Sequence, residues 1–82
     1  MAAQRVLVVD DEPTVRDVVA RYLERDGYVV HEIGDGDQVV AAVESFRPDL
    51  VVLDVMLPGR SGLDVLRELG DRVPVILLTA RT

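Results

Sequence analysis

The chain has 82 residues, of which 49% are hydrophobic and 29% charged, and its formal net charge at pH 7 is −6. This length allows one domain near the lower limit of what folds around a single core, and the composition is typical of a globular protein rather than a disordered one. The sequence has no cysteine, no basic patch and no apolar run of roughly 18 residues, so it excludes disulfides, disfavours nucleic-acid binding and predicts a cytoplasmic protein without a membrane segment.

The first predicted strand, residues 5–9, is an apolar run without alternation, which indicates burial on both faces. It leads into an acidic stretch, Asp10 to Glu12, and Pro13 then favours the first turn of a helix. Gly27 is expected to end that helix. Its core-facing side chains are predicted from helical spacing to be Val15, Val18, Val19, Tyr22 and Leu23.

A second strand is predicted over residues 28–33, and the turn over residues 34–37 supplies an N-cap for a second helix. The acidic turn superficially resembles a calcium-binding loop, but apolar residues stand where the fifth and twelfth ligands are needed. The helix is expected to face the core with Val39, Val40, Val43 and Phe46.

The strongest strand signal is the apolar run over residues 50–53, which ends in Asp54. Burying an ionised aspartate costs several kcal/mol or more without compensation, and the carboxyl end of a strand, where open α/β sheets bind ligands, avoids most of that cost. A third helix is predicted to begin near Ser61 and Asp64 in a pattern like a capping box, with Leu63, Leu66 and Leu69 buried. The last predicted strand, Val75 to Leu78, ends at Thr79.

Alternating strands and helices predict a parallel sheet joined by right-handed crossovers, whose strand ends lie at one edge. If the first and third strands are neighbours, Asp10, Asp11 and Asp54 converge there, and such like charges destabilise the fold unless a cation joins them. Oxygen ligands suit a hard ion such as Mg²⁺, and a carboxylate beside Mg²⁺ can act as a nucleophile toward a phosphoryl group. Alternatively, these residues have structural roles only. The acids at residues 10–12 then stand where the dipole of a helix N-terminus favours negative charge, Asp54 caps a loop and Thr79 ends a strand.

The segments Val8-Val9-Asp10-Asp11-Glu12, Leu53-Asp54-Val55-Met56-Leu57-Pro58-Gly59 and Leu78-Thr79-Ala80 closely resemble, in order and spacing, the receiver domain of bacterial two-component response regulators. The resemblance implies a flavodoxin-like (CheY-like) doubly wound parallel sheet of order 2-1-3-4. It identifies residues 1–82 as a partial receiver domain, C-terminally truncated, with the fifth strand and the last two helices missing.

The resemblance also implies a role for each site residue. Asp54 accepts a phosphoryl group from a sensor histidine kinase, and Asp10, Asp11, Asp54 and the backbone carbonyl of Met56 hold Mg²⁺. Thr79 and Ala80 contact the phosphoryl group as part of a switch. The protein is then a phosphoacceptor switch rather than an enzyme, and DNA is reached only through an absent C-terminal effector domain that regulates transcription.

Two departures from the family pattern carry expectations of their own. The lysine that ends the family's fifth strand has no counterpart, because the chain contains no lysine, so we expect impaired phosphorylation. Arg81 is not a like-for-like substitute. The strand at residues 75–78 is left as an edge with a bare apolar face, so we expect self-association there.

Two rival interpretations stay open at this stage. One is a Mg²⁺-dependent phosphatase with an aspartate nucleophile, although such enzymes place a D-x-D pair after the first strand, whereas Asp10 and Asp11 are adjacent. The other is an interaction module that works without phosphorylation. Turnover of a generic phosphate ester would favour the phosphatase, and a single stoichiometric phosphorylation would favour the receiver.

Overall fold

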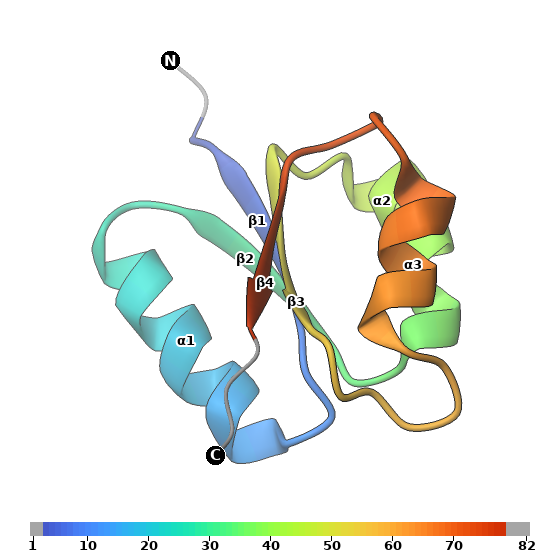
Figure 1. Ribbon diagram of the computed structural model, residues 1–82. Coiled ribbons are helices and arrows are strands. Elements are labelled where there is room, and N and C mark those ends of the chain that lie inside the picture. Colours follow the sequence, from blue (N-terminus) through green and yellow to red (C-terminus); the bar gives the residue numbers. More distant parts are fainter. Residues whose placement is uncertain (1–2, 79–82) are drawn as a thin grey trace.

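The computed structural model describes residues 3–78. Strands and helices alternate along the chain, as the apolar patterns predict (Figure 1). The elements in order are β1 (Arg5–Val9), α1 (Pro13–Arg25), β2 (Val29–Ile33), the 3₁₀ turn η1 (Gly36–Gln38), α2 (Val39–Phe46), β3 (Leu50–Asp54), α3 (Gly62–Leu69) and β4 (Val75–Leu78).

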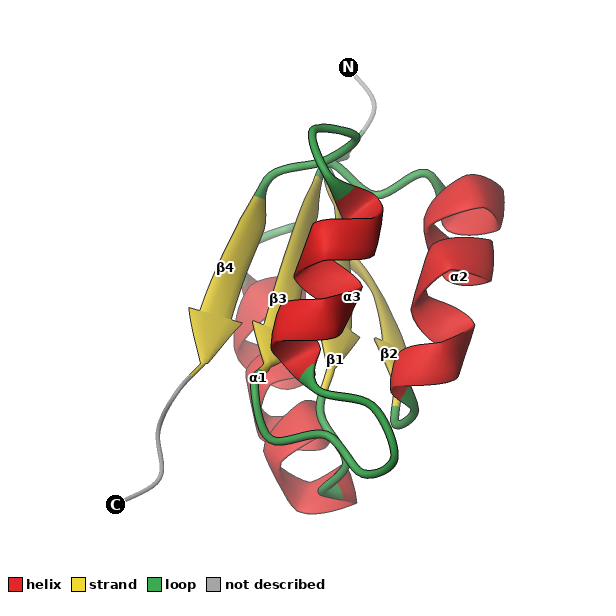
Figure 2. Ribbon diagram, turned by 45° about the vertical axis from the view of Figure 1, so that its right-hand side comes forward, coloured by secondary structure: helices red, strands yellow, loops and turns green. Residues whose placement is uncertain are grey.

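The strands form one parallel sheet of order β2-β1-β3-β4, which confirms the predicted topology. All strand arrows point the same way (Figure 2). In the register of the central strands, Val9 lies opposite both Ile33 of β2 and Leu53 of β3. The residues that follow Val9 and Leu53 therefore emerge side by side at the carboxyl edge of the sheet.

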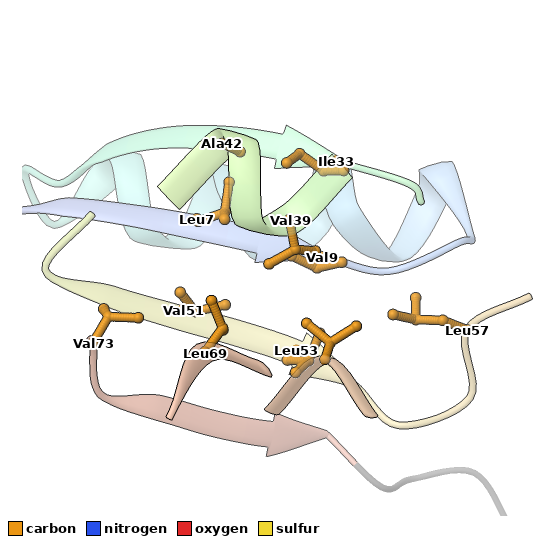
Figure 3. Packing of buried hydrophobic residues seen from close by; sticks show 11 residues of the cluster. Leu7, Val9, Ile33, Val39, Ala42, Val51, Leu53, Leu57, Leu69 and Val73 are labelled. Carbon is orange, nitrogen blue, oxygen red and sulfur yellow. The ribbon is translucent and has the colours of Figure 1, made fainter. Parts of the chain in front are cut away.

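Helices cover both faces of the sheet, with α1 on one face and α2 and α3 on the other (Figures 1 and 2). The apolar runs of β1 and β3 are buried on both faces because side chains alternate along a strand and meet a helix layer on each side. The larger core cluster lies on the face of α2 and α3 (Figure 3). Its buried members are Leu7, Val9, Ile33, Val39, Ala42, Val51, Leu53, Leu57, Val65, Leu69 and Val73.

Helix α1 corrects part of the predicted core. Val18 and Tyr22 are 47% and 65% exposed, whereas Val19 and Leu23 pack against the smaller core cluster and Ala20 is buried. The main strand contacts of α1 are with β2 and β1, so only one side of its apolar stripe meets the sheet. The predicted stripe is therefore too wide.

Helix α3 shows the same kind of difference at its first turn. Ser61 caps the helix, since its Oγ accepts a hydrogen bond from the backbone N–H of Leu63 at 3.1 Å. The side chain of Leu63 is 45% exposed, so the prediction of a buried Leu63 is wrong. Val65 is fully buried in its place, and Leu69 is buried as predicted. No helix within residues 3–78 is both long and apolar enough to cross a membrane.

The two leucines at the ends of α3 give a matched test of this packing. Leu69→Ala empties a buried position and should lower the free energy of unfolding by about 2–5 kcal/mol. Leu63→Ala removes a half-exposed side chain and should change it by roughly 0.5 kcal/mol or less. Urea denaturation of both variants measures the difference, and equal losses would contradict the orientation of α3.

Candidate functional site

The turn after β1 holds a buried carboxylate in a fixed orientation. Asp10 is 3% exposed, and its backbone N–H donates to the carbonyl oxygen of Ile33 at 3.1 Å. Its Oδ1 accepts a hydrogen bond from the N–H of Glu12 at 2.9 Å, an Asx-turn that leads the chain into α1. Asp11, between these two residues, is exposed.

The end of β3 repeats this arrangement. Asp54 is also 3% exposed, and its Oδ1 accepts a hydrogen bond from the N–H of Met56 at 2.9 Å. The start of α3 lies against the end of β3, because the N–H of Gly62 donates to the carbonyl oxygen of Val55 at 3.0 Å. A Cβ at residue 62 would lie 2.7 Å from the Cα of Val55, so the close approach of α3 to the end of β3 requires glycine.

Asp10, Asp11 and Asp54 form a cluster at this edge, and one carboxylate oxygen from each lies within 4.8 Å of the others. Two of the three are buried, where their mutual repulsion is screened less than in water. The donor set is oxygen only, which is what hard divalent ions such as Mg²⁺ prefer, and the separations allow all three oxygens to reach one ion. The residues therefore fit a magnesium site.

A pocket of about 500 Å³ opens beside the acidic cluster. It is lined by Asp11 and by residues 55–61, the loop between β3 and α3. Arg60, one of the lining residues, forms an ion pair with Glu68 on α3. Asp11 of the acidic cluster can thus be approached from solvent along the β3–α3 loop.

The structure brings together the three aspartates that the sequence singles out, and the backbone N–H of Met56 donates to one of them, Asp54. Thr79 and Ala80, predicted to contact a phosphoryl group, lie outside the described residues. Sequence reasoning missed Arg16, whose Nη1 donates to the backbone carbonyl oxygen of Asp10 at 2.8 Å. Only its place in the first turns of the helix that follows Asp10 could have indicated it.

Comparison with known proteins agrees with this geometry. Residues 6–82 match the family described as the response regulator receiver domain. The DNA-binding response regulator MtrA of Mycolicibacterium smegmatis is 48% identical over 81 residues, which cover 96% of this chain and 36% of that protein. The chain thus spans about a third of the length of this relative.

Solved structures show the same fold. The N-terminal domain of a response regulator receiver protein from Methanoculleus marisnigri superposes with a TM-score of 0.90 at 35% identity, covering 98% of this chain and 69% of that one. The response regulator TrrA of Thermotoga maritima, solved in complex with Mg²⁺-BeF, gives a TM-score of 0.86 at 38% identity and covers 96% and 71% of the two chains.

The acidic cluster predicts opposite effects of one substitution with and without metal. Saturating Mg²⁺ should stabilise the chain, by about 2.7 kcal/mol at a hundred times its dissociation constant. Asp11→Asn removes a ligand and should abolish most of this gain, yet it should raise the melting temperature in metal-free buffer by relieving repulsion. Thermal melts across a Mg²⁺ series measure both effects.

Asp26→Asn is the matched control, because it removes the same charge from an exposed residue at the end of α1. It should leave the Mg²⁺ response unchanged. A wild-type melting temperature that does not respond to Mg²⁺ would contradict the site.

Proposed function

The chain belongs to the response regulator receiver domain family, and on that premise we propose that it is a phosphorylation-dependent switch in a two-component system. Asp54 accepts a phosphoryl group from a sensor histidine kinase. The observation that carries this proposal is the buried Asp54 carboxylate at the sheet edge, beside the carboxylates of Asp10 and Asp11. Residues 1–82 supply the part of the receiver that runs from β1 to β4.

The chemistry is a transfer between two nucleophiles. A carboxylate oxygen of Asp54 attacks the phosphorus of a phosphohistidine, a P–O bond forms, and the P–N bond breaks as the imidazole leaves. The hydrogen bond from the N–H of Met56 fixes the orientation of the attacking carboxylate in advance. Mg²⁺ held by Asp10, Asp11, Asp54 and the backbone carbonyl of Met56 would neutralise charge that builds on the transferring oxygens.

Two further expectations belong to this proposal. The hydroxyl of Thr79 and the neighbouring Ala80 contact the phosphoryl group and report its presence. Because the chain contains no lysine, the basic contact that the family pattern provides at this site is not supplied by residues 1–82. We therefore expect phosphorylation of this chain to be slow, and the switch to be incomplete.

Phosphorylation adds charge and acceptor oxygens at the sheet edge, which biases a surface that a partner reads. The relative MtrA is named as a DNA-binding response regulator, which supports transcription regulation as the output. With a net charge of −6, this chain is expected to reach DNA only through a separate effector domain. Its partners are then a histidine kinase and that domain, in the cytoplasm.

A phosphatase would differ from a receiver in the number of reactions that each molecule carries out. An enzyme would release phosphate repeatedly from a generic ester, whereas a receiver is phosphorylated once. The chain's family and the position of the best-placed nucleophile, at the end of β3 rather than after β1, favour the receiver. An interaction module that needs no phosphorylation would give neither result.

Incubation with acetyl phosphate and Mg²⁺ tests the proposal. Intact mass should show a single added phosphoryl group on the wild type and none on Asp54→Asn, which keeps the size of the side chain but removes the nucleophile. Asp26→Asn, which removes the same charge from an exposed residue at the C-terminal end of α1, should be phosphorylated like the wild type. Steady turnover of a phosphate ester, or modification of Asp54→Asn, would contradict the receiver function.

We propose in addition that this chain self-associates through β4. In the described sheet β4 pairs with β3 on one side only. Ile76 lies opposite Val52 on the α1 face and is 51% exposed, because α1 packs mainly over β2 and β1. An edge strand with an apolar residue and no charge in Val75–Leu78 favours pairing with a second copy.

Sedimentation velocity tests this second proposal. The wild type should form a dimer at high concentration, and Ile76→Arg should shift it to monomer because a charge would be buried at the new interface. Leu63→Arg, a change at a similarly exposed site on α3, should leave the dimer intact. A wild type that stays monomeric and folded would refute association through this edge.

A further inference from the structure

Arg16 of α1 reaches from the helix to the turn that presents the acidic cluster. Its Nη1 donates to the backbone carbonyl oxygen of Asp10 at 2.8 Å, and its side chain is 20% exposed. We propose that Arg16 is a positioning residue for the metal site, which holds the Asp10 turn in the geometry that binds Mg²⁺. The inference rests on the magnesium site of the proposed function and assigns it a residue that is not a ligand.

The guanidinium of Arg16 is enclosed by three elements. It is attached to α1, bonds to the residue after β1, and its Nε lies 3.7 Å from a carboxylate oxygen of Glu32 on β2. This Nε is buried and has no hydrogen-bond partner among the described residues. Gly34 leaves the space that the guanidinium fills, since a Cβ at residue 34 would lie 2.6 Å from Nη1. The side chain is therefore locked in one place.

The bond from Arg16 adds to the hydrogen bonds that anchor Asp10. Its N–H is bonded to the carbonyl of Ile33, its carboxylate to the N–H of Glu12, and its carbonyl to Arg16. Without the guanidinium, the carbonyl would lose the hydrogen bond that ties it to α1, and buried backbone acceptors favour a conformation in which they are paired. The peptide after Asp10 could then rotate, and rotation would move Asp10 and Asp11 relative to Asp54.

Electrostatics alone predicts the opposite effect, so the sign of a single measurement separates the two accounts. Arg16 carries a positive charge close to the acidic cluster and repels an incoming cation. If it acted only through its charge, its removal would tighten Mg²⁺ binding. If it positions Asp10, its removal should weaken Mg²⁺ binding by roughly 10–100-fold, the usual effect of losing a residue that supports a metal ligand.

The experiment is a Mg²⁺ titration of the whole chain, with the rise in melting temperature as the readout and no phosphoryl donor present. Arg16→Met keeps the length of the side chain and should raise the dissociation constant at least about tenfold. Arg16→Lys keeps one donor for the carbonyl of Asp10 and should give an intermediate value. Arg21→Met, an exposed arginine on the same helix, should match the wild type.

Gly34→Ala supplies an independent test, because it keeps Arg16 and displaces its guanidinium by crowding. It should weaken Mg²⁺ binding as Arg16→Met does, and it decides the question if Arg16→Met fails to fold. Unchanged or tighter binding in the two variants would overturn the positioning role and leave the proposed function intact. A wild type that shows no Mg²⁺ response would instead overturn the metal site itself and this inference with it.

Discussion

Strands β1 and β3 lie side by side with Val9 opposite Leu53, so the next residue of each segment, Asp10 or Asp54, is an aspartate at the same edge of the sheet. Asp10 and Asp54 are both 3% exposed, and the third acid, Asp11, lies within reach of both. Placing like charges so close opposes folding unless a cation or hydrogen bonds compensate them. The apolar layers on both faces of the sheet must therefore be stable enough to hold a repulsive edge.

A hydrogen bond from the backbone stabilises the buried carboxylate at both strand ends. At each, the aspartate accepts a hydrogen bond at 2.9 Å from the backbone N–H two residues later, from Glu12 in one case and Met56 in the other. Such a bond satisfies one oxygen and helps to fix the plane of the carboxylate. Gly62 then lets α3 pack directly against the end of β3. The site is rigid because the backbone itself orients it.

The sequence predicts the strands and their order well, because four-residue apolar runs such as Leu50–Leu53 have few alternatives to a buried parallel strand. It predicts the helix faces less well. Helical periodicity shows which residues share a face, but the width of the buried strip depends on what lies opposite, so Val18 and Leu63 are exposed against expectation. Arg16 escapes prediction because its partner is a backbone carbonyl, which carries no sequence signal. Thr79 and Ala80 lie outside the described residues and stay predictions.

The surroundings of the acidic cluster also differ from one side to the other. Arg16 approaches Asp10 from α1 and is enclosed by Glu32 and Gly34, which leaves that side filled by protein. The pocket lined by Asp11 and residues 55–61 leaves the other side open. Under the proposed function, a phosphoryl donor would approach along the β3–α3 loop, which includes the N–H of Met56 that orients Asp54. Because the approach and the orientation of the carboxylate depend on the same loop, a change in that loop would alter both the rate of transfer and the choice of donor.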